Sequence, residues 1–262
     1  MLTALRFVSM ARYESFLFSG VLVMLRRRPA SERGIYDYGW LQTAHTFSFN
    51  EYHDPAHNKF RVLRVMNEDH VAPGGGFGLH PHRDMEIVTV VLSGTLAHED
   101  SLGHRQTLRP DEVQWMSAGS GIRHSEFNHS SDEPVHLYQI WLLPREKGME
   151  PAYDQRVFDP AARQNRWQLL AAPANGVASE ALPIRQDARL SRSTLGNDAA
   201  LETEFAPGRH GWVQVMSGAV TARSSSGEEV TLATGDGLAI SDESQLTLRT
   251  KDGADVLLFD LA

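Results

Sequence analysis

Two short stretches of the sequence carry residues whose types and spacing suit metal chemistry. His80 and His82 stand at H-x-H spacing, and His124 and Glu126 stand at H-x-E spacing. In an extended strand, side chains two positions apart leave the same face. If the two strands face each other, three imidazoles and a carboxylate converge on one point. This donor set suits one first-row divalent metal ion and leaves room for a further ligand.

The distribution of the histidines supports a metal site in the first half of the chain. A single H-x-H pair more often marks two ordinary surface histidines than a pair of ligands. Of the 12 histidines, however, all except His210 lie between His45 and His136, and glycines precede both pairs. The remaining candidates are expected to be surface or hydrogen-bonded residues rather than ligands: His98, His104, His129 and His136.

Short strands and turns have to position these residues. Residues 86–92 are apolar and rich in β-branched side chains, which predicts a buried strand that turns at Ser93-Gly94. Residues 215–219 look like an equivalent hairpin, so the chain contains a duplicated unit whose second copy lacks the H-x-H and H-x-E pairs. Evenly spaced strands of this kind predict an all-β fold of two jelly-roll barrels in tandem. Only the N-terminal barrel is expected to bind a metal.

Charged residues and prolines between residues 144 and 160 indicate a connector between the two barrels. We therefore expect an N-terminal domain at residues 24–158 and a C-terminal domain at residues 159–262. Residues 1–23 would form an extension outside the barrel pattern. The apolar run at residues 15–25 could be the core of a signal peptide, but it is too short for a spanning helix, and arginines 26–28 follow it at once.

The composition excludes several classes of function. A hydrophobic content of 41% allows a packed core, and 22% charged residues argue against disorder. The net charge of −8 disfavours direct nucleic-acid binding, which needs a basic patch. Without cysteine, any metal must bind through nitrogen and oxygen, and the chain fits a reducing cytoplasm. Glycines 74–76 do not begin a phosphate loop, because no Gly-Lys-Ser/Thr follows them.

The two stretches resemble the two motifs of the cupin superfamily. The first motif is matched by Gly74, His80, His82 and Glu86, with Gly94 one residue late, and the second by Gly121, His124 and Asn128. Residues 117–119 read Ser-Ala-Gly where many cupins have Pro-x-Gly. Together with residues 45–49 and 116–126, this departure resembles the pirin family, and within it bacterial pirins described as quercetin 2,3-dioxygenases. The resemblance covers about residues 25 to 262.

The resemblance implies roles for the site residues. His80, His82, His124 and Glu126 would hold one divalent ion, iron(II) in particular, although nickel, cobalt, copper or manganese suits the same donors. Glu86 is a rival carboxylate because it fills the usual cupin ligand position. In pirins the ligand is taken to be the carboxylate two residues after the last histidine, here Glu126. Glu86 would then support the site, for example by holding a ligand imidazole in one tautomer.

The resemblance also implies a reaction. A flavonol would lose its 3-hydroxyl proton to Glu126, and dioxygen would open the ring with release of carbon monoxide. The apolar pocket wall is expected from Trp40, Phe47, Phe49 and Met116. The protein would be a cytoplasmic monomer without a membrane or nucleic-acid partner, and translation would start at Met24. The alternative is a non-catalytic role, because some pirins are regarded as iron-dependent co-regulators that act through protein partners.

Overall fold

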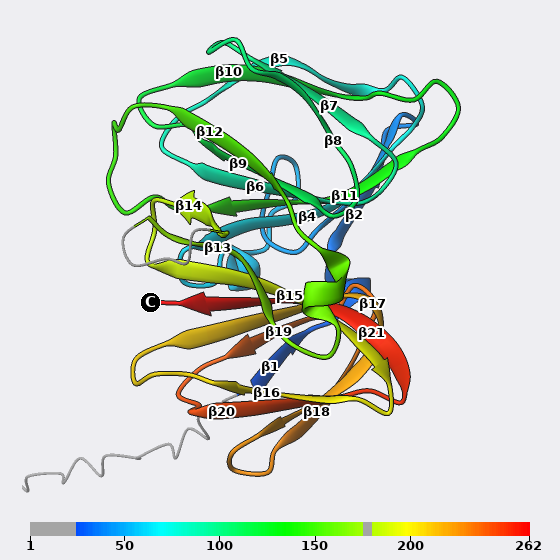
Figure 1. Ribbon diagram of the computed structural model, residues 1–262, viewed down its shortest axis with the longest axis vertical. Helices are drawn as coiled ribbons and strands as arrows, with labels where there is room; N and C mark the ends of the chain where they lie inside the picture. Colours follow the sequence, from blue (N-terminus) through cyan, green and yellow to red (C-terminus); the bar gives the residue numbers. More distant parts are fainter. Residues whose placement is uncertain (1–24, 175–179) are drawn as a thin grey trace, which may run out of the picture.

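The computed structural model describes residues 25–174 and 180–262, which form two β-barrels stacked along the long axis of the molecule (Figure 1). The expectation of an all-β fold with tandem jelly-roll barrels is confirmed. Three short 3-10 helices occur in the described residues, and no helix there is long and apolar enough to cross a membrane. The expectations for residues 1–23 lie outside the described residues. The helices are η1 (Ala30–Glu32), η2 (Pro55–His57) and η3 (Pro160–Arg163).

The N-terminal barrel combines a seven-stranded sheet with a four-stranded sheet. The larger sheet has the order β12-β9-β6-β11-β4-β3-β2, and the smaller has the order β5-β10-β7-β8. The strands of the larger sheet are β2 (Gly34–Asp37), β3 (Leu41–His45), β4 (Leu63–Val71), β6 (Glu86–Ser93), β9 (Glu112–Ser117), β11 (Val135–Leu142) and β12 (Ala152–Val157). Those of the smaller sheet are β5 (Gly76–His82), β7 (Leu96–Asp100), β8 (Arg105–Leu108) and β10 (Ile122–Asn128).

The C-terminal barrel is built on a ten-stranded sheet with the main path β1-β19-β17-β21-β15-β13-β14. Its first strand comes from the other end of the chain, because β1 pairs antiparallel with β19. The sequence pattern assigned these residues to the N-terminal domain, whereas here they add an edge strand to the second barrel. The strands are β1 (Leu25–Arg28), β13 (Gln168–Pro173), β14 (Leu182–Ile184), β15 (Ala188–Asn197), β16 (Ala200–Glu204), β17 (His210–Ser224), β18 (Glu229–Ala233), β19 (Gly237–Ile240), β20 (Gln245–Arg249) and β21 (Asp252–Leu261).

The two barrels pack against each other through a shared apolar core. On β6, Val88 and Val90 join this core, while Ile87 and Val91 face the interior of the N-terminal barrel. Since side chains alternate along a strand, β6 is buried on both faces, which explains its unbroken apolar run. From the C-terminal side, Trp212 enters the shared core.

The predicted duplication is visible in two hairpins. Gly94 after β6 and Gly218 within β17 both have φ of 78°, a conformation that suits glycine. A Cβ on Gly94 would lie 2.6 Å from the carbonyl oxygen of Pro134, and one on Gly218 would overlap the carbonyl oxygen of Gly253. The same turn therefore serves both barrels for the same steric reason.

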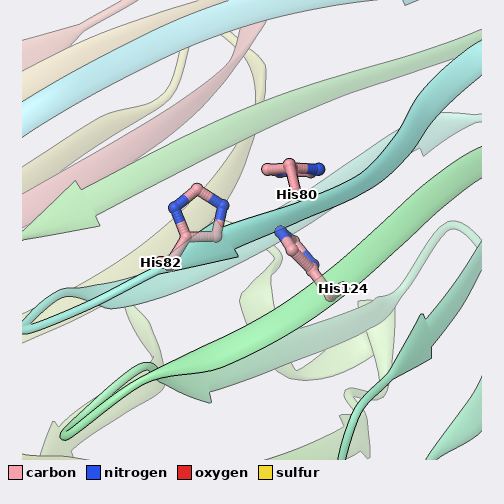
Figure 2. A group of neighbouring side chains, drawn as sticks. All are labelled: His80, His82 and His124. Carbon is pink, nitrogen blue, oxygen red and sulfur yellow. The ribbon is translucent and has the colours of Figure 1, made fainter.

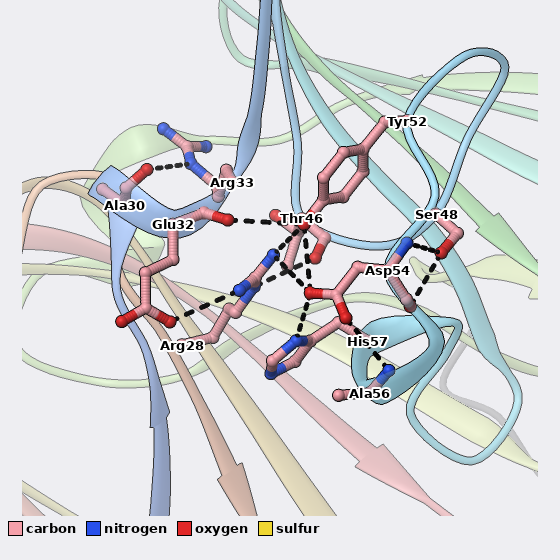
Figure 3. A network of polar contacts seen from close by, with 10 residues as sticks. All are labelled: Arg28, Ala30, Glu32, Arg33, Thr46, Ser48, Tyr52, Asp54, Ala56 and His57. Carbon is pink, nitrogen blue, oxygen red and sulfur yellow. Dashed lines mark hydrogen bonds and ion pairs between the residues drawn. The ribbon is translucent and has the colours of Figure 1, made fainter.

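A polar network anchors the loop between β3 and β4 (Figure 3). The Arg28 side chain is only 3% exposed, and it donates from Nη2 to the Tyr52 hydroxyl at 2.6 Å and from Nε to the Thr46 carbonyl at 3.2 Å. The Tyr52 hydroxyl lies 3.2 Å from the Asp54 carboxylate, to which it can donate. Because Arg28 belongs to β1, the edge of the C-terminal barrel holds the loop that carries Phe49.

Candidate metal centre

Neighbouring strands bring the two sequence motifs together. His80 and His82 lie on β5 and His124 lies on β10, which pairs antiparallel with β5 so that His124 is opposite His80. The ring centroid of His80 lies 4.7 Å from that of His82 and 4.4 Å from that of His124. The centroids of His82 and His124 lie 4.8 Å apart. One nitrogen from each ring lies within 4.8 Å of the other two. Figure 2 shows the three side chains gathered beside the two neighbouring strands.

Glu126 lies further along β10, behind a register shift between β5 and β10. Its carboxylate forms a second close group with His98 and His124. Glu126 Oε2 accepts a hydrogen bond of 2.7 Å from Gln139 Nε2, and Gln139 Oε1 in turn accepts one of 3.0 Å from Trp141 Nε1. Glu126 Oε1 has no hydrogen-bond partner although the residue is buried. The amide thus fixes one carboxylate oxygen and leaves the other available.

The hydrogen bonding of the histidines fits a bound cation. His124 is fully buried, yet neither of its ring nitrogens has a partner, which is costly unless a ligand is present. His80 Nδ1 lies 2.7 Å from the Gly78 carbonyl oxygen and must carry the hydrogen, so its Nε2 keeps a free lone pair. Burial and the neighbouring imidazoles lower the pKa of His82 and of His124 to about 3. These rings are therefore neutral donors at physiological pH.

His80, His82 and Glu126 line a cavity of about 400 Å³ between the two sheets of the N-terminal barrel, and the buried His124 lies behind them. This volume is in the range that small-molecule sites occupy. Aromatic rings meet at the cavity: Trp141 lies 4.8 Å from His82 and 5.4 Å from Phe49, edge-on to both. The lining residues are Leu41, Thr43, His45, Phe49, Asn50, Asn67, Asp69, Phe77, His80, His82, Glu126, Gln139 and Trp141.

Comparison with known proteins agrees with this architecture. Residues 26–142 match the family described as Pirin, and residues 169–261 match the family described as Quercetinase C-terminal cupin domain. The protein named quercetin 2,3-dioxygenase from Escherichia coli K12 is 45% identical over 238 residues, covering 91% of this chain and 99% of that protein. This chain belongs to the pirin family.

Further relatives extend the comparison. A pirin-like protein from Caulobacter vibrioides is 39% identical over 241 residues, which cover 91% of this chain and all of that protein. The crystal structure of the bacterial pirin YhhW from Escherichia coli in complex with nickel(II) superimposes with a TM-score of 0.84. It shares 45% sequence identity and covers 91% of this chain and 99% of that one.

One expectation for this pirin needs correction. Glu86 was expected to hold a ligand imidazole, but its carboxylate accepts from Trp115 Nε1 at 2.7 Å and from the Ser117 hydroxyl at 2.5 Å. The Arg185 backbone N–H, from the C-terminal half, donates to it at 2.9 Å. The physical reason is strand parity. Glu86 has the same parity on β6 as Val88, which faces the other barrel rather than the metal centre.

The expected pocket wall is also only partly right. Phe49 lines the cavity, whereas Phe47 packs against Trp212 in the core between the barrels, with ring centroids 5.0 Å apart. Met116 is buried with Ile87 in a separate cluster, away from the lining. Trp40 packs edge-on against Phe77, one residue removed from the cavity. Three of the four expected wall residues are therefore replaced by residues that the sequence reasoning did not select.

The residues that were missed are mostly polar. Asn67 and Asp69 on β4 and Gln139 on β11 point into the cavity at alternate positions. Burial, with Glu126 and Glu68 nearby, raises the pKa of Asp69 to about 7. His98, by contrast, was expected to be a surface or hydrogen-bonded residue, and it is buried beside His124 with its Nε2 3.4 Å from Asp100 Oδ2. The sequence did carry a signal for Asn67, Asp69 and Gln139 as lining residues, because each is a polar residue on an otherwise apolar face of its strand.

Proposed function

We propose that this pirin is a metal-dependent dioxygenase that cleaves flavonols. His80, His82, His124 and Glu126 would hold one divalent transition ion, and Glu126 would also act as the base. The observation that carries the proposal is the fully buried His124, whose two ring nitrogens lack partners beside two further imidazoles that line the cavity. Nitrogen and carboxylate donors suit iron(II) and nickel(II) alike.

The names of the relatives support both parts of this proposal. A protein that is 45% identical over nearly its whole length is named quercetin 2,3-dioxygenase, and a bacterial pirin of the same identity was crystallised with nickel(II). When bound, the ion would lower the pKa of a flavonol hydroxyl and prepare the ring for dioxygen. The residues of the chain have to supply the proton acceptor and the dry cavity.

Glu126 is built to accept that proton. Gln139 holds Oε2 in place, so the unpartnered Oε1 is the atom that receives the proton from the substrate hydroxyl. Burial raises the pKa of Glu126, which makes its carboxylate a stronger base than an exposed one. Because the carboxylate is buried, no water competes for Oε1 in a closed complex.

The cavity walls would orient the substrate rings. Phe49, Phe77 and Trp141 offer aromatic surface, and His45, Asn67 and Asp69 offer polar groups for hydroxyls further from the metal centre. A flat polyhydroxylated aromatic molecule matches this mixture better than an aliphatic substrate does. The partners of the reaction would be a flavonol and dioxygen.

The direct test is turnover by protein of defined metal content. Metal-free protein is loaded separately with iron(II), nickel(II), cobalt(II), copper(II) or manganese(II) and mixed with quercetin in air. Loss of the flavonol absorption band together with release of carbon monoxide is expected for at least one ion. If every loaded form binds its ion but leaves all tested flavonols intact, the dioxygenase proposal is refuted and a regulatory role becomes the better account.

A further inference from the structure

A second group of potential ligands lies on the opposite face of β4 from the cavity. Asn67 and Asp69 point into the cavity, so the alternating residues Glu68 and His70 point outward. On the neighbouring strand β11, His136 is the register partner of His70. One ligand atom from each of Glu68, His70 and His136 lies within 4.8 Å of the other two.

The two imidazoles lie face to face on neighbouring strands. The rings of His70 and His136 are stacked, with centroids 3.9 Å apart and an angle of 16° between their planes. A tetrahedral ion that binds two imidazoles at about 2.0–2.1 Å keeps their nitrogens roughly 3.3 Å apart. Stacked rings direct their in-plane lone pairs along nearly parallel lines, so at least one side chain has to rotate before both nitrogens can face one ion. One nitrogen of each ring already lies within 4.8 Å of the other and of a Glu68 oxygen.

The carboxylate is oriented toward the same point. Arg33 Nη1 donates to Glu68 Oε2 at 2.8 Å, while Glu68 Oε1 lies 3.0 Å from His136 Nε2. One oxygen of Glu68 is thus held by Arg33, and the other lies beside the His136 ring.

We propose that Glu68, His70 and His136 form a second metal site, for a borderline divalent ion such as zinc(II) or nickel(II). Two imidazoles and one carboxylate exclude a preference for magnesium or calcium, which take oxygen ligands. Three protein ligands leave a fourth position for water. His70 is exposed, so the site is open to metal ions in solution without passage through the catalytic cavity.

The position of the site gives it a structural consequence. Met66 and Tyr138 lie on the same faces of β4 and β11 as these ligands, and both pack into the core between the barrels. Arg33, which holds Glu68, lies beside Gly235 of the C-terminal barrel. An ion on Glu68, His70 and His136 therefore sits at the rim of the interface between the two barrels and braces β4 against β11.

Equilibrium dialysis against zinc(II), followed by elemental analysis, tests the site. Protein whose catalytic centre is already loaded is expected to bind one further zinc ion per chain. His70→Asn and His136→Asn should each weaken this second binding at least 10-fold, while the first equivalent and its affinity stay unchanged. His129→Asn, which alters an exposed histidine elsewhere on the same barrel, is the matched control and should behave like the wild type.

The outcomes are unambiguous and independent of flavonol turnover. Absence of a second equivalent in the wild type refutes the site, and so does a second equivalent that persists in a His70→Asn/His136→Asn double variant. The retained first equivalent reports that each variant is folded. A His80→Ala/His82→Ala variant should keep the zinc ion at Glu68, His70 and His136, so failure of the catalytic centre and failure of this site are distinguishable.

Discussion

The two barrels share a framework but have opposite interiors. Both turn their equivalent hairpins at a glycine with φ of 78°, and both are built mainly of antiparallel strand pairs. The N-terminal barrel encloses imidazoles, carboxylates and amides around a cavity. The interior cluster of the C-terminal barrel is instead almost wholly aliphatic: Leu25, Leu195, Phe205, Val213, Val215, Val220, Ala222, Leu232, Leu238, Ile240, Leu246, Leu248, Ala254, Val256 and Leu258.

This difference shows that the framework does not specify the site. A few polar residues at inward positions convert a packed barrel into a reactive one, and they do so at a cost in stability. Both nitrogens of His124 and Oε1 of Glu126 are examples of buried polar atoms without partners at the metal centre. The C-terminal barrel, with its aliphatic interior cluster, supports this centre, because its edge strand β1 anchors the cavity loop through Arg28.

The largest expected effect comes from removing the proposed base from the N-terminal barrel. Glu126→Gln keeps the size of the side chain but removes its negative charge, and it should lower flavonol turnover by about 10²- to 10⁴-fold, the usual contribution of a general base. The measurement is loss of the flavonol band in air at saturating metal. The matched control is Glu243→Gln, which changes a buried carboxylate of the C-terminal barrel and should leave turnover intact. Full activity of Glu126→Gln at saturating metal would exclude its role as base.

The next effect concerns metal affinity. His124→Leu gives the N-terminal barrel an aliphatic residue like those inside the C-terminal barrel and removes a proposed ligand. Loss of a ligand should weaken binding of the catalytic ion by more than about 100-fold, beyond the 10- to 100-fold typical of outer hydrogen-bond partners. Competition with a coloured chelator measures the change. An affinity within about 10-fold of the wild type would show that His124 is not a ligand. Such a small loss of affinity is what removal of a ligand's hydrogen-bond partner causes, and removal of a ligand itself should cost more.

Glu86→Gln should show whether Glu86 contributes to the stability of the fold or to metal affinity. The carboxylate accepts hydrogen bonds from Trp115, Ser117 and the backbone of Arg185, so an amide N–H would face one of these donors. We expect a loss of about 2 kcal/mol in the free energy of unfolding, as for a buried charged acceptor. Metal affinity at the three histidines should change less than about 3-fold, because the effect of an outer ligand partner would be at least 10-fold. Urea unfolding and metal titration of the same sample give both values.

The fold and the histidines of the site could be predicted from the sequence, because both follow from local periodicity. The H-x-H and H-x-E spacings place His80, His82 and His124 on inward faces once β5 and β10 are neighbours. The role of Glu86 could not be predicted in this way. Its place in the motif does not say whether its side chain on β6 faces the metal centre or the other barrel. Its parity with Val88 becomes informative only when the second barrel is known to cover that face.

The cavity wall was harder to predict because it depends on sheet closure and on one loop. Phe47 and Phe49 are two residues apart, yet one faces the C-terminal barrel and the other faces the cavity. The chain leaves strand geometry there, and Phe49 pairs only with Tyr52 in an isolated bridge. Asp69 and Gln139 line the cavity because β4 and β11 are neighbours, which a single sequence does not reveal.

The smallest expected effect is that His124→Leu becomes more stable relative to the wild type as the pH becomes mildly acidic. The pKa of His124 is about 3 in the folded chain and about 6.5 when unfolded, so only the unfolded chain takes up this proton as the pH falls below 6.5. The wild type therefore loses up to about 1.4 kcal/mol per pH unit through His124 between pH 6.5 and 3, and nothing above pH 6.5. Asp69, whose pKa is raised to about 7, has the opposite sign: its contribution weakens as the pH rises from about 4 to 7.

Comparing metal-free wild type with metal-free His124→Leu cancels the Asp69 contribution and leaves that of His124, together with the part of the lowered His82 pKa that His124 causes. Lowering the pH from 7 to 5.5 crosses one unit of the window, so the variant should gain about 1.4 kcal/mol relative to the wild type, measured by urea unfolding at both pH values. Bound metal would stabilise only the folded wild type and hide the effect, which is why both proteins must be metal-free. An equal pH dependence in the two proteins would mean that His124 is already protonated or solvated in the folded chain. In that case its unpartnered nitrogens would no longer indicate a place reserved for a metal ion.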